Sequence, residues 1–110
     1  MGNEKANKVL IANLIMPEAD KEYNWALPKN CRWFTLQARG GALIRVAVEA
    51  GHVASSAPPY FTIKVDNSWD EKQLDVDTRY GLPLFFACGS AGETIEAIMG
   101  IYDPSIGGEA

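Results

Sequence analysis

Short runs in which apolar and polar residues alternate recur along the chain, separated by segments rich in Gly, Pro and Asn. The clearest run is 32–38, RWFTLQA, where Phe34, Leu36 and Ala38 share one face. Alternation at every second position is typical of a strand with one buried face. On this basis we predict strands over 32–38, 42–49, 60–65, 73–77 and 82–88.

The apolar run 8–16, KVLIANLIM, ends at Pro17. Its β-branched residues Val9, Ile11 and Ile15 favour a strand. Because apolar residues fall at both odd and even positions, we expect this strand to be partly covered on both of its faces.

Gly40 and Gly41 separate the runs 32–38 and 42–49. Paired glycines accept the positive φ that tight turns between antiparallel strands require. We therefore predict that these two strands form a hairpin. In its second strand the residues expected to face inward are Ile44, Val46 and Val48, and those expected to face outward are Arg45, Ala47 and Glu49.

The segment 93–101 fits two patterns. Ser90 and Glu93 have the spacing of a helix capping box, and Ile95, Ile98 and Met99 lie at helical intervals. A strand would instead place Ile95, Ala97, Met99 and Ile101 on one face. Glycines at 92 and 100 weaken a helix, so we favour the strand.

Together these patterns predict an all-β protein, built as a single antiparallel β-sandwich of the jelly-roll or immunoglobulin-like type with about six to eight short strands. The chain of 110 residues is 47% hydrophobic, which suits one domain with one core. We expect the sandwich over 8–102, a flexible N-terminal arm over 1–7 and a flexible C-terminal tail over 103–110. Cys31 and Cys88 could pair or remain free, and the sequence leaves both states open.

The net charge of −4 and the scattered basic residues argue against nucleic-acid binding. No run is long and apolar enough to span a bilayer, and the polar start MGNEKANK has no secretory signal behind it, so we expect cytoplasmic synthesis and no membrane partner. His52 is the single histidine and lies in a small-residue loop. With no nucleophile, base and orienting acid in view, we expect neither an enzyme nor a cofactor.

Acidic residues are concentrated over 66–77, which begins with a predicted turn between the strands 60–65 and 73–77. This stretch carries five acids against Lys72, a local sum equal to the net charge of the whole chain, and Trp69 lies among them. A basic partner surface is the natural complement. The acids are Asp66, Asp70, Glu71, Asp75 and Asp77.

The same segment partly matches a calcium-binding loop, because Asp66, Ser68 and Asp70 alternate and Asp77 stands at the twelfth position. However, Glu71 replaces the glycine that such a loop needs for its sharp turn. We favour a solvated acidic rim, and expect no bound metal.

Three phrases carry a resemblance when taken in order: WALPKNCRWFTLQARGGALIRVAVEAG, PPYFTIKVDNSWDEKQLDV and LPLFFACGSAGETIEAIMGIY. They resemble a class of small bacteriophage virion proteins with a β-sandwich fold, over roughly residues 23–102. The resemblance implies a structural protein of the virion, made in the host bacterial cytoplasm, either a capsid decoration or cement subunit or a component of the tail or fibre.

On that hypothesis the partners are the phage major capsid protein or other virion proteins, and a homo-oligomer, with a trimer favoured. The candidate contact residues are Trp69, Asp66, Asp70, Glu71, Tyr60, Lys5 and Lys8. The competing hypothesis is a carbohydrate-binding sandwich in which Trp69, Tyr60 or Trp33 stacks on a sugar.

Overall fold

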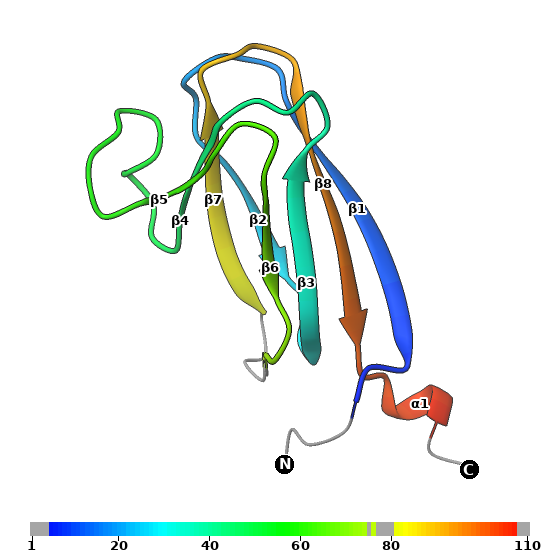
Figure 1. Ribbon diagram of the computed structural model, residues 1–110. Coiled ribbons are helices and arrows are strands. Elements are labelled where there is room, and N and C mark those ends of the chain that lie inside the picture. Colours follow the sequence, from blue (N-terminus) through cyan, green and yellow to red (C-terminus); the bar gives the residue numbers. More distant parts are fainter. Residues whose placement is uncertain (1–4, 75, 77–80, 108–110) are drawn as a thin grey trace.

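A computed structural model describes residues 5–74, 76 and 81–107. Two antiparallel four-stranded sheets face one another (Figure 1), which confirms the all-β class. The first sheet has the order β1 (Lys8–Met16), β8 (Glu93–Ile101), β3 (Cys31–Ala38), β6 (Ser68–Glu71). The second sheet has the order β2 (Tyr23–Leu27), β7 (Leu82–Cys88), β4 (Ile44–Ala47), β5 (Phe61–Ile63). A single helical turn, α1 (Pro104–Gly107), follows β8.

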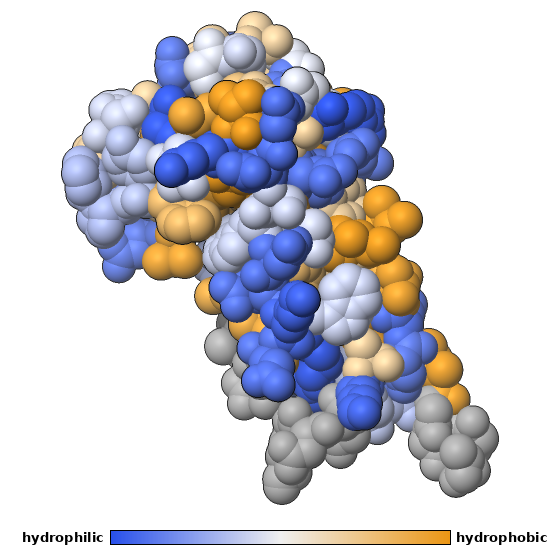
Figure 2. Space-filling view, in the orientation of Figure 1, coloured by the Kyte–Doolittle hydropathy of each residue, from blue (hydrophilic) through white to orange (hydrophobic). Residues whose placement is uncertain are grey.

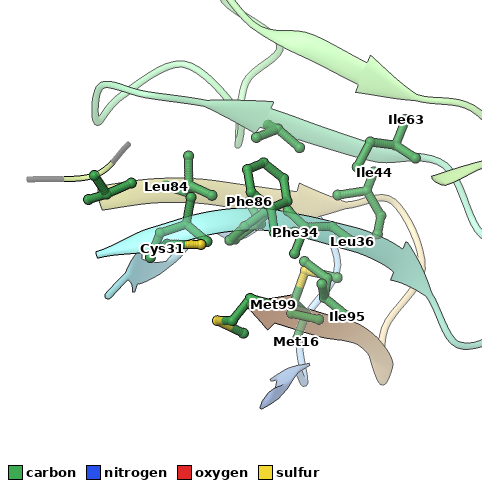
Figure 3. Packing of buried hydrophobic residues seen from close by; sticks show 14 of the residues in the cluster. Met16, Cys31, Phe34, Leu36, Ile44, Ile63, Leu84, Phe86, Ile95 and Met99 are labelled. Carbon is green, nitrogen blue, oxygen red and sulfur yellow. The ribbon is translucent and has the colours of Figure 1, made fainter. Parts of the chain in front are cut away.

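The hydrophobic core lies between the two sheets (Figure 3). Phe34 and Leu36 of β3 point into it from the first sheet, and Leu84 and Phe86 of β7 point into it from the second. All four are buried, as the alternation of β3 predicted for its own pair. Burying a side chain of this size stabilises the fold by about 1.5–3 kcal/mol.

The segment 93–101 is a strand, and the helix is excluded. β8 lies inside the first sheet and pairs with β1 on one side and β3 on the other. The four residues expected on one face are all buried, namely Ile95, Ala97, Met99 and Ile101. Gly100, one of the two glycines that weakened the helix prediction, leaves room for the Trp33 indole. A Cβ added at Gly100 would collide with that indole.

The predicted hairpin between 32–38 and 42–49 is wrong. β3 pairs with β8 and β6, whereas β4 pairs with β7 and β5 in the opposite sheet. The glycine segment therefore carries the chain across the core instead of turning it back within one sheet. Gly41 does adopt the expected positive φ, of 78°. Alternation shows which face of each strand is buried. It does not show whether two successive strands pair within one sheet or face each other from opposite sheets, because both arrangements give the same alternating pattern.

Glu93 stabilises the connection between β3 and β4. Its carboxylate accepts hydrogen bonds from the backbone N–H groups of Gly40 at 2.9 Å, Ala42 at 3.4 Å and Thr94 at 2.8 Å. Burial acts to raise the pKa of Glu93, but these backbone donors and the Arg39 charge outweigh it, so the pKa lies below its ordinary value of 4.5. A carboxylate at the start of β8 thus holds the connection between the two sheets.

Two strands differ from the sequence prediction. β2 was not predicted: its first two residues, Tyr23 and Asn24, end a polar segment, and Trp25 to Leu27 lead directly into Pro28. The strand expected over 73–77 is displaced to Ser68–Glu71, inside the supposed acidic turn. Leu74 and Val76 instead donate single backbone hydrogen bonds to the carbonyl oxygens of Arg32 and Cys31. Asp75 and Asp77 lie outside the described residues.

The connection between β4 and β5 folds back over the outer face of the second sheet. There Val53 packs with Ala47 and Ala87 in a small second cluster, so Ala47, expected to face solvent, is buried. Arg45 also faces outward but is covered, and its guanidinium donates to the Val53 carbonyl at 2.5 Å and to Asp20 at 2.9 Å. Arg45 therefore holds the connection between β4 and β5 in place, and the backbone of that connection in turn covers the Arg45 side chain.

The outer face of β1 is exposed, which contradicts the expectation of partial cover on both faces. Val9, Ile11 and Ile15 are 57%, 70% and 61% exposed, while Leu10, Ala12 and Leu14 pack against the core. β1 is the edge of its sheet, beside β8 alone (Figure 1). Hydrophobic surface is visible along this side of the molecule (Figure 2).

The two ends of the described chain lie side by side. The Asn7 amide donates to the Asp103 carbonyl at 2.9 Å and accepts from the Asp103 N–H at 2.8 Å. Asp103 also accepts from Ser105 at 2.7 Å, which begins α1 where a flexible tail was expected. Residues 1–4 and 108–110 lie outside the described part, and their flexibility stays a prediction.

Candidate functional site

An apolar hollow of about 290 Å³ opens between the two sheets where β5 and β6 form their neighbouring edges. Its walls come from the end of β4, the start of β5 and the middle of β6. The side chains that line it are overwhelmingly apolar, and three of them are aromatic or proline rings from adjacent positions 59–61. The lining residues are Val46, Ala47, Val48, Glu49, Pro59, Tyr60, Phe61 and Trp69.

Trp69 lines the hollow and also covers the hydrophobic core. It pairs with Leu36 in the β3–β6 ladder, so its side chain turns inward toward the second sheet. Its ring meets Phe34 edge to face at 4.9 Å between centroids and Phe61 at 5.7 Å. Aromatic pairs in such arrangements contribute about 0.5–1.5 kcal/mol beyond the area they bury. Trp69 therefore joins the edges of the two sheets across the core.

The hollow lies where apolar residues continue past the end of β4. Val46 is buried, but Val48, which follows the last residue of β4, is 60% exposed. Phe61 pairs with Val46 and is 55% exposed, although it faces the same way as the buried Ile63. Val48, which we expected on the inward face of a strand, instead lies past the end of β4 and is mostly exposed.

The acids of this region do not surround Trp69 as one patch. Because β6 is a strand, Trp69 and Glu71 share one face, and Ser68 and Asp70 share the other. The Trp69 indole N–H donates to Glu71 at 3.0 Å, while the Ser68 hydroxyl lies 3.4 Å from Asp70. Asp66 stands apart, in the turn before β6, with its carboxylate against Gly41.

Glu49 is the one charged residue among those that line the hollow. Its side chain is 74% exposed and lies 3.7 Å from the His52 ring, which also contacts the Ala57 carbonyl at 2.8 Å. His52 is therefore part of the loop structure beside the hollow. The mouth carries a carboxylate, and Glu71 supplies a second behind the indole.

Of the residues proposed as contacts, the structure brings together Tyr60 and Trp69, which line the hollow with Glu71 bound to the indole. Lys8 does not join them. It begins β1, on the edge of the first sheet farthest from β6, and lies 3.8 Å from Asp103. Lys5 precedes the same strand and is exposed.

Sequence reasoning missed Val48 and Phe61 as surface residues. Both were assigned to inward faces, and that direction holds for Phe61, which pairs with the buried Val46. What the alternation lacks is the length of the opposing sheet, which decides whether an inward side chain is covered. The one available signal was the uninterrupted apolar and aromatic character from Pro58 to Phe61 directly before a strand.

The described residues contain no group of three His, Cys, Asp or Glu side chains able to hold a metal ion. Asp77, one of the four positions in the calcium pattern, lies outside them. Both cysteines are free and buried. Burial raises the pKa of the Cys31 thiol, opposed by its hydrogen bond to the Trp33 carbonyl and by the Arg32 charge, so this thiol is poorly suited to nucleophilic chemistry.

Comparisons with protein-family models, curated proteins and solved structures found no match for this chain. Among the described residues, no helix has the length and apolar character needed to cross a membrane.

Proposed function

We propose that this protein is a non-enzymatic structural subunit of a bacteriophage particle, most simply a capsid decoration or cement subunit, which grips a coat-protein segment in the Trp69 hollow. The observation that carries the proposal is the exposed apolar hollow itself. Val48 and Phe61 are each more than half exposed beside Trp69. Contiguous exposed apolar surface with a polar rim marks interaction sites, and central aromatic anchors dominate the energy of such contacts.

The strand order supports this class of protein. The chain changes sheet at each connection except that between β4 and β5, giving the orders 1-8-3-6 and 2-7-4-5. That is the pattern of a jelly roll, so we propose the jelly-roll type for this sandwich and set aside the immunoglobulin-like type. Viral capsid and lectin domains are among the proteins that use the jelly roll. Because one fold can have many functions, the proposed function rests on the hollow and not on the fold.

The partner's chemistry follows from the lining. An aliphatic or aromatic side chain would displace water from Val48, Phe61 and Trp69, at a gain of about 25 cal/mol for each Å² of apolar surface buried. A neighbouring Lys or Arg would meet Glu49 at the mouth. We therefore propose a coat-protein loop with one large apolar residue beside a basic one. Many weak copies of such a contact stabilise a lattice through avidity.

A sugar ligand is less well served by the same hollow. Sugar recognition needs several hydrogen-bonding groups around the stacking ring, since each hydroxyl loses water on binding. Among the side chains lining the hollow only Glu49, Tyr60 and the Trp69 indole have polar atoms, and the indole N–H is already bonded to Glu71. Carbohydrate binding is therefore kept as an outcome of the test.

The experiment compares particles that carry wild-type chain, Phe61→Lys and Val65→Lys. Phe61 lines the hollow, whereas Val65 is 58% exposed in the turn before β6 and serves as a matched control. Quantitative mass spectrometry of purified particles should find wild-type chain and Val65→Lys at the same fixed ratio to coat protein. Phe61→Lys should be depleted at least tenfold, although its circular dichroism matches that of wild type.

Two results would contradict the proposal. One is the absence of wild-type chain from otherwise complete particles. The other is saturable binding of free wild-type chain to a glycan array that Phe61→Lys abolishes, together with unchanged incorporation of Phe61→Lys into particles, which would assign the hollow to sugar.

A further inference from the structure

The four edge strands of the two sheets, β1, β6, β2 and β5, differ in how well they are protected against pairing with an additional strand. β2, β5 and β6 have five, three and four residues, and β6 carries two acids. β1 has nine residues and pairs with β8 without a bulge along its whole length. Short strands, charges, prolines and bulges are the usual means by which proteins protect an edge. β1 uses none of them between Val9 and Met16.

The outer face of this edge is apolar as well as flat. Val9, Ile11 and Ile15 lie on it at alternate positions, with only Asn13 between them, and each is more than half exposed. Ile98 of β8 extends the same surface and is 38% exposed. About half of the backbone N–H and C=O groups of an edge strand point away from its sheet. β1 therefore offers both hydrogen bonds and apolar side chains to an added strand.

We propose that β1 pairs antiparallel with β1 of a second copy of this chain, joining two first sheets into one continuous eight-stranded sheet. This inference is independent of the Trp69 hollow, because the strand that carries Trp69 forms the opposite edge of the same sheet.

The sequence of β1 suits pairing with itself. The overlap that uses all nine residues places Ala12 on the two-fold axis, Ile11 opposite Asn13 and Val9 opposite Ile15. Since the offset preserves odd and even positions, the exposed stripes of the two copies fall on the same face. Directly opposed β-branched side chains contribute about 0.2–1 kcal/mol per pair. Two-fold contacts of this kind are the commonest between identical subunits.

The charges favour the antiparallel direction. Between Val9 and Met16 the strand itself has no ionisable side chain. The Arg39 guanidinium donates to the Asn13 side chain at 2.8 Å, but its charge is paired with Glu96. Lys8 stands at the start of β1 and Glu18 just past its end, and both are exposed. An antiparallel pair brings Lys8 of one copy toward Glu18 of the other, whereas a parallel pair would bring lysine beside lysine. The trimer implied by the resemblance would need a head-to-tail contact that this edge does not offer.

Sedimentation equilibrium of the purified chain tests the pairing. Wild type and Val65→Lys should approach twice the chain mass of 12.0 kDa as concentration rises. Ile11→Lys should remain at the mass of one chain over the same range. Ile11 is 70% exposed and Val65 58% exposed, so lysine is compatible with the fold at both sites. A wild-type chain that stays monomeric, or forms a trimer, or an Ile11→Lys variant that assembles like wild type, would overturn the proposal.

Cross-linking tests the register. Ile11→Cys and Asn13→Cys chains, mixed and oxidised, should form the mixed disulfide in at least fivefold excess over either symmetric one, because these positions face each other across the axis. The native cysteines are buried and do not compete. Equal amounts of the three products, or none, would contradict the proposed pairing while leaving the function assigned to the hollow untouched.

Discussion

The two edges of the first sheet are built in opposite ways. β6 is four residues long and turns its one large apolar side chain, Trp69, inward, where it contacts Phe34 and Phe61. β1 is nine residues long and turns three large apolar side chains outward, away from the core. At one edge the protein covers its own interior, and at the other it leaves apolar surface that contributes little to its own stability.

This contrast separates two meanings of an exposed hydrophobic residue. At β6 the exposed ring surface is the outer side of a group whose inner side stabilises the monomer. At β1 the exposed surface lies on a strand whose other face already completes the core. Substitutions should therefore change the free energy of unfolding at the first edge and assembly at the second.

The largest effect is expected for Trp69→Ala. Removing the ring uncovers Phe34 and leaves the edges of the two sheets unjoined, so the free energy of unfolding should fall by about 2–4 kcal/mol. Trp69→Phe keeps a ring near Phe34 and should lose less than half as much. Urea denaturation followed by circular dichroism measures both. A loss below about 0.5 kcal/mol for Trp69→Ala would show that the ring does not cover the core.

The second-largest loss of stability is expected for Gly100→Ala, in β8, which lies between β1 and β3 in the first sheet. The new methyl group would project into the Trp33 indole and against Ala6, so the indole must move, at about 1–3 kcal/mol. In a Trp33→Ala background the same change should cost less than half as much. Equal losses in both backgrounds, in a double-mutant cycle of urea midpoints, would contradict this account.

A smaller and pH-dependent effect is expected at Glu93. Because its folded pKa lies below the ordinary value of 4.5, its carboxylate stabilises the fold above that pH, and the contribution is lost as pH falls through the folded pKa. Glu93→Gln should therefore be less stable than wild type at pH 7, and the difference should shrink toward pH 3. Thermal melts across this range measure it. A stability difference between Glu93→Gln and wild type that grows on acidification would contradict a lowered pKa of Glu93 in the folded state.

The smallest effect on the single chain is expected for Ile11→Lys. At concentrations where wild type is monomeric, its free energy of unfolding should stay within about 0.5 kcal/mol of wild type. Ile95→Ala, on the buried face of the same sheet, should lose about 2–4 kcal/mol and serves as the contrast. A large loss for Ile11→Lys in dilute urea titrations would mean that the outer stripe stabilises the monomer.

Much of the fold follows from alternation, because one buried face is the property that alternation records. It predicted the strand at 93–101 and the buried faces of β3 and β8. It could not decide between pairing and crossing at Gly40 and Gly41, since both place Ile44 inward. β2 was not predicted, because its first two residues continue a polar segment and its three apolar residues end at Pro28, which leaves too short a run for alternation to be recognised.

For the candidate site, the concentration of charge and aromatic residues indicated Trp69 and Tyr60, and both line the hollow. The error lay in treating 66–71 as a turn. Once Ser68–Glu71 is a strand, its pleat places Asp70 and Trp69 on opposite faces, and a sum of charges along the sequence no longer describes one surface. The exposure of Val48 and Phe61 depends on where the strands around them end, which is a long-range property.

The adjacency of Asn7 and Asp103, near the two ends of the described chain, bears on the rate of folding. The most extensive strand pair joins Lys8 to Ile101, so nearly the whole chain must be enclosed before it forms, and such long-range closure slows folding. A circular permutant that links the two ends and opens the chain at the exposed turn Ser90–Ala91 would make β8 and β1 consecutive. We expect it to fold faster than the natural order, by stopped-flow refolding, with the same sheets in the product. Because β8 is synthesised after the other described strands, β1 lacks the partner that the structure shows for it until β8 has formed.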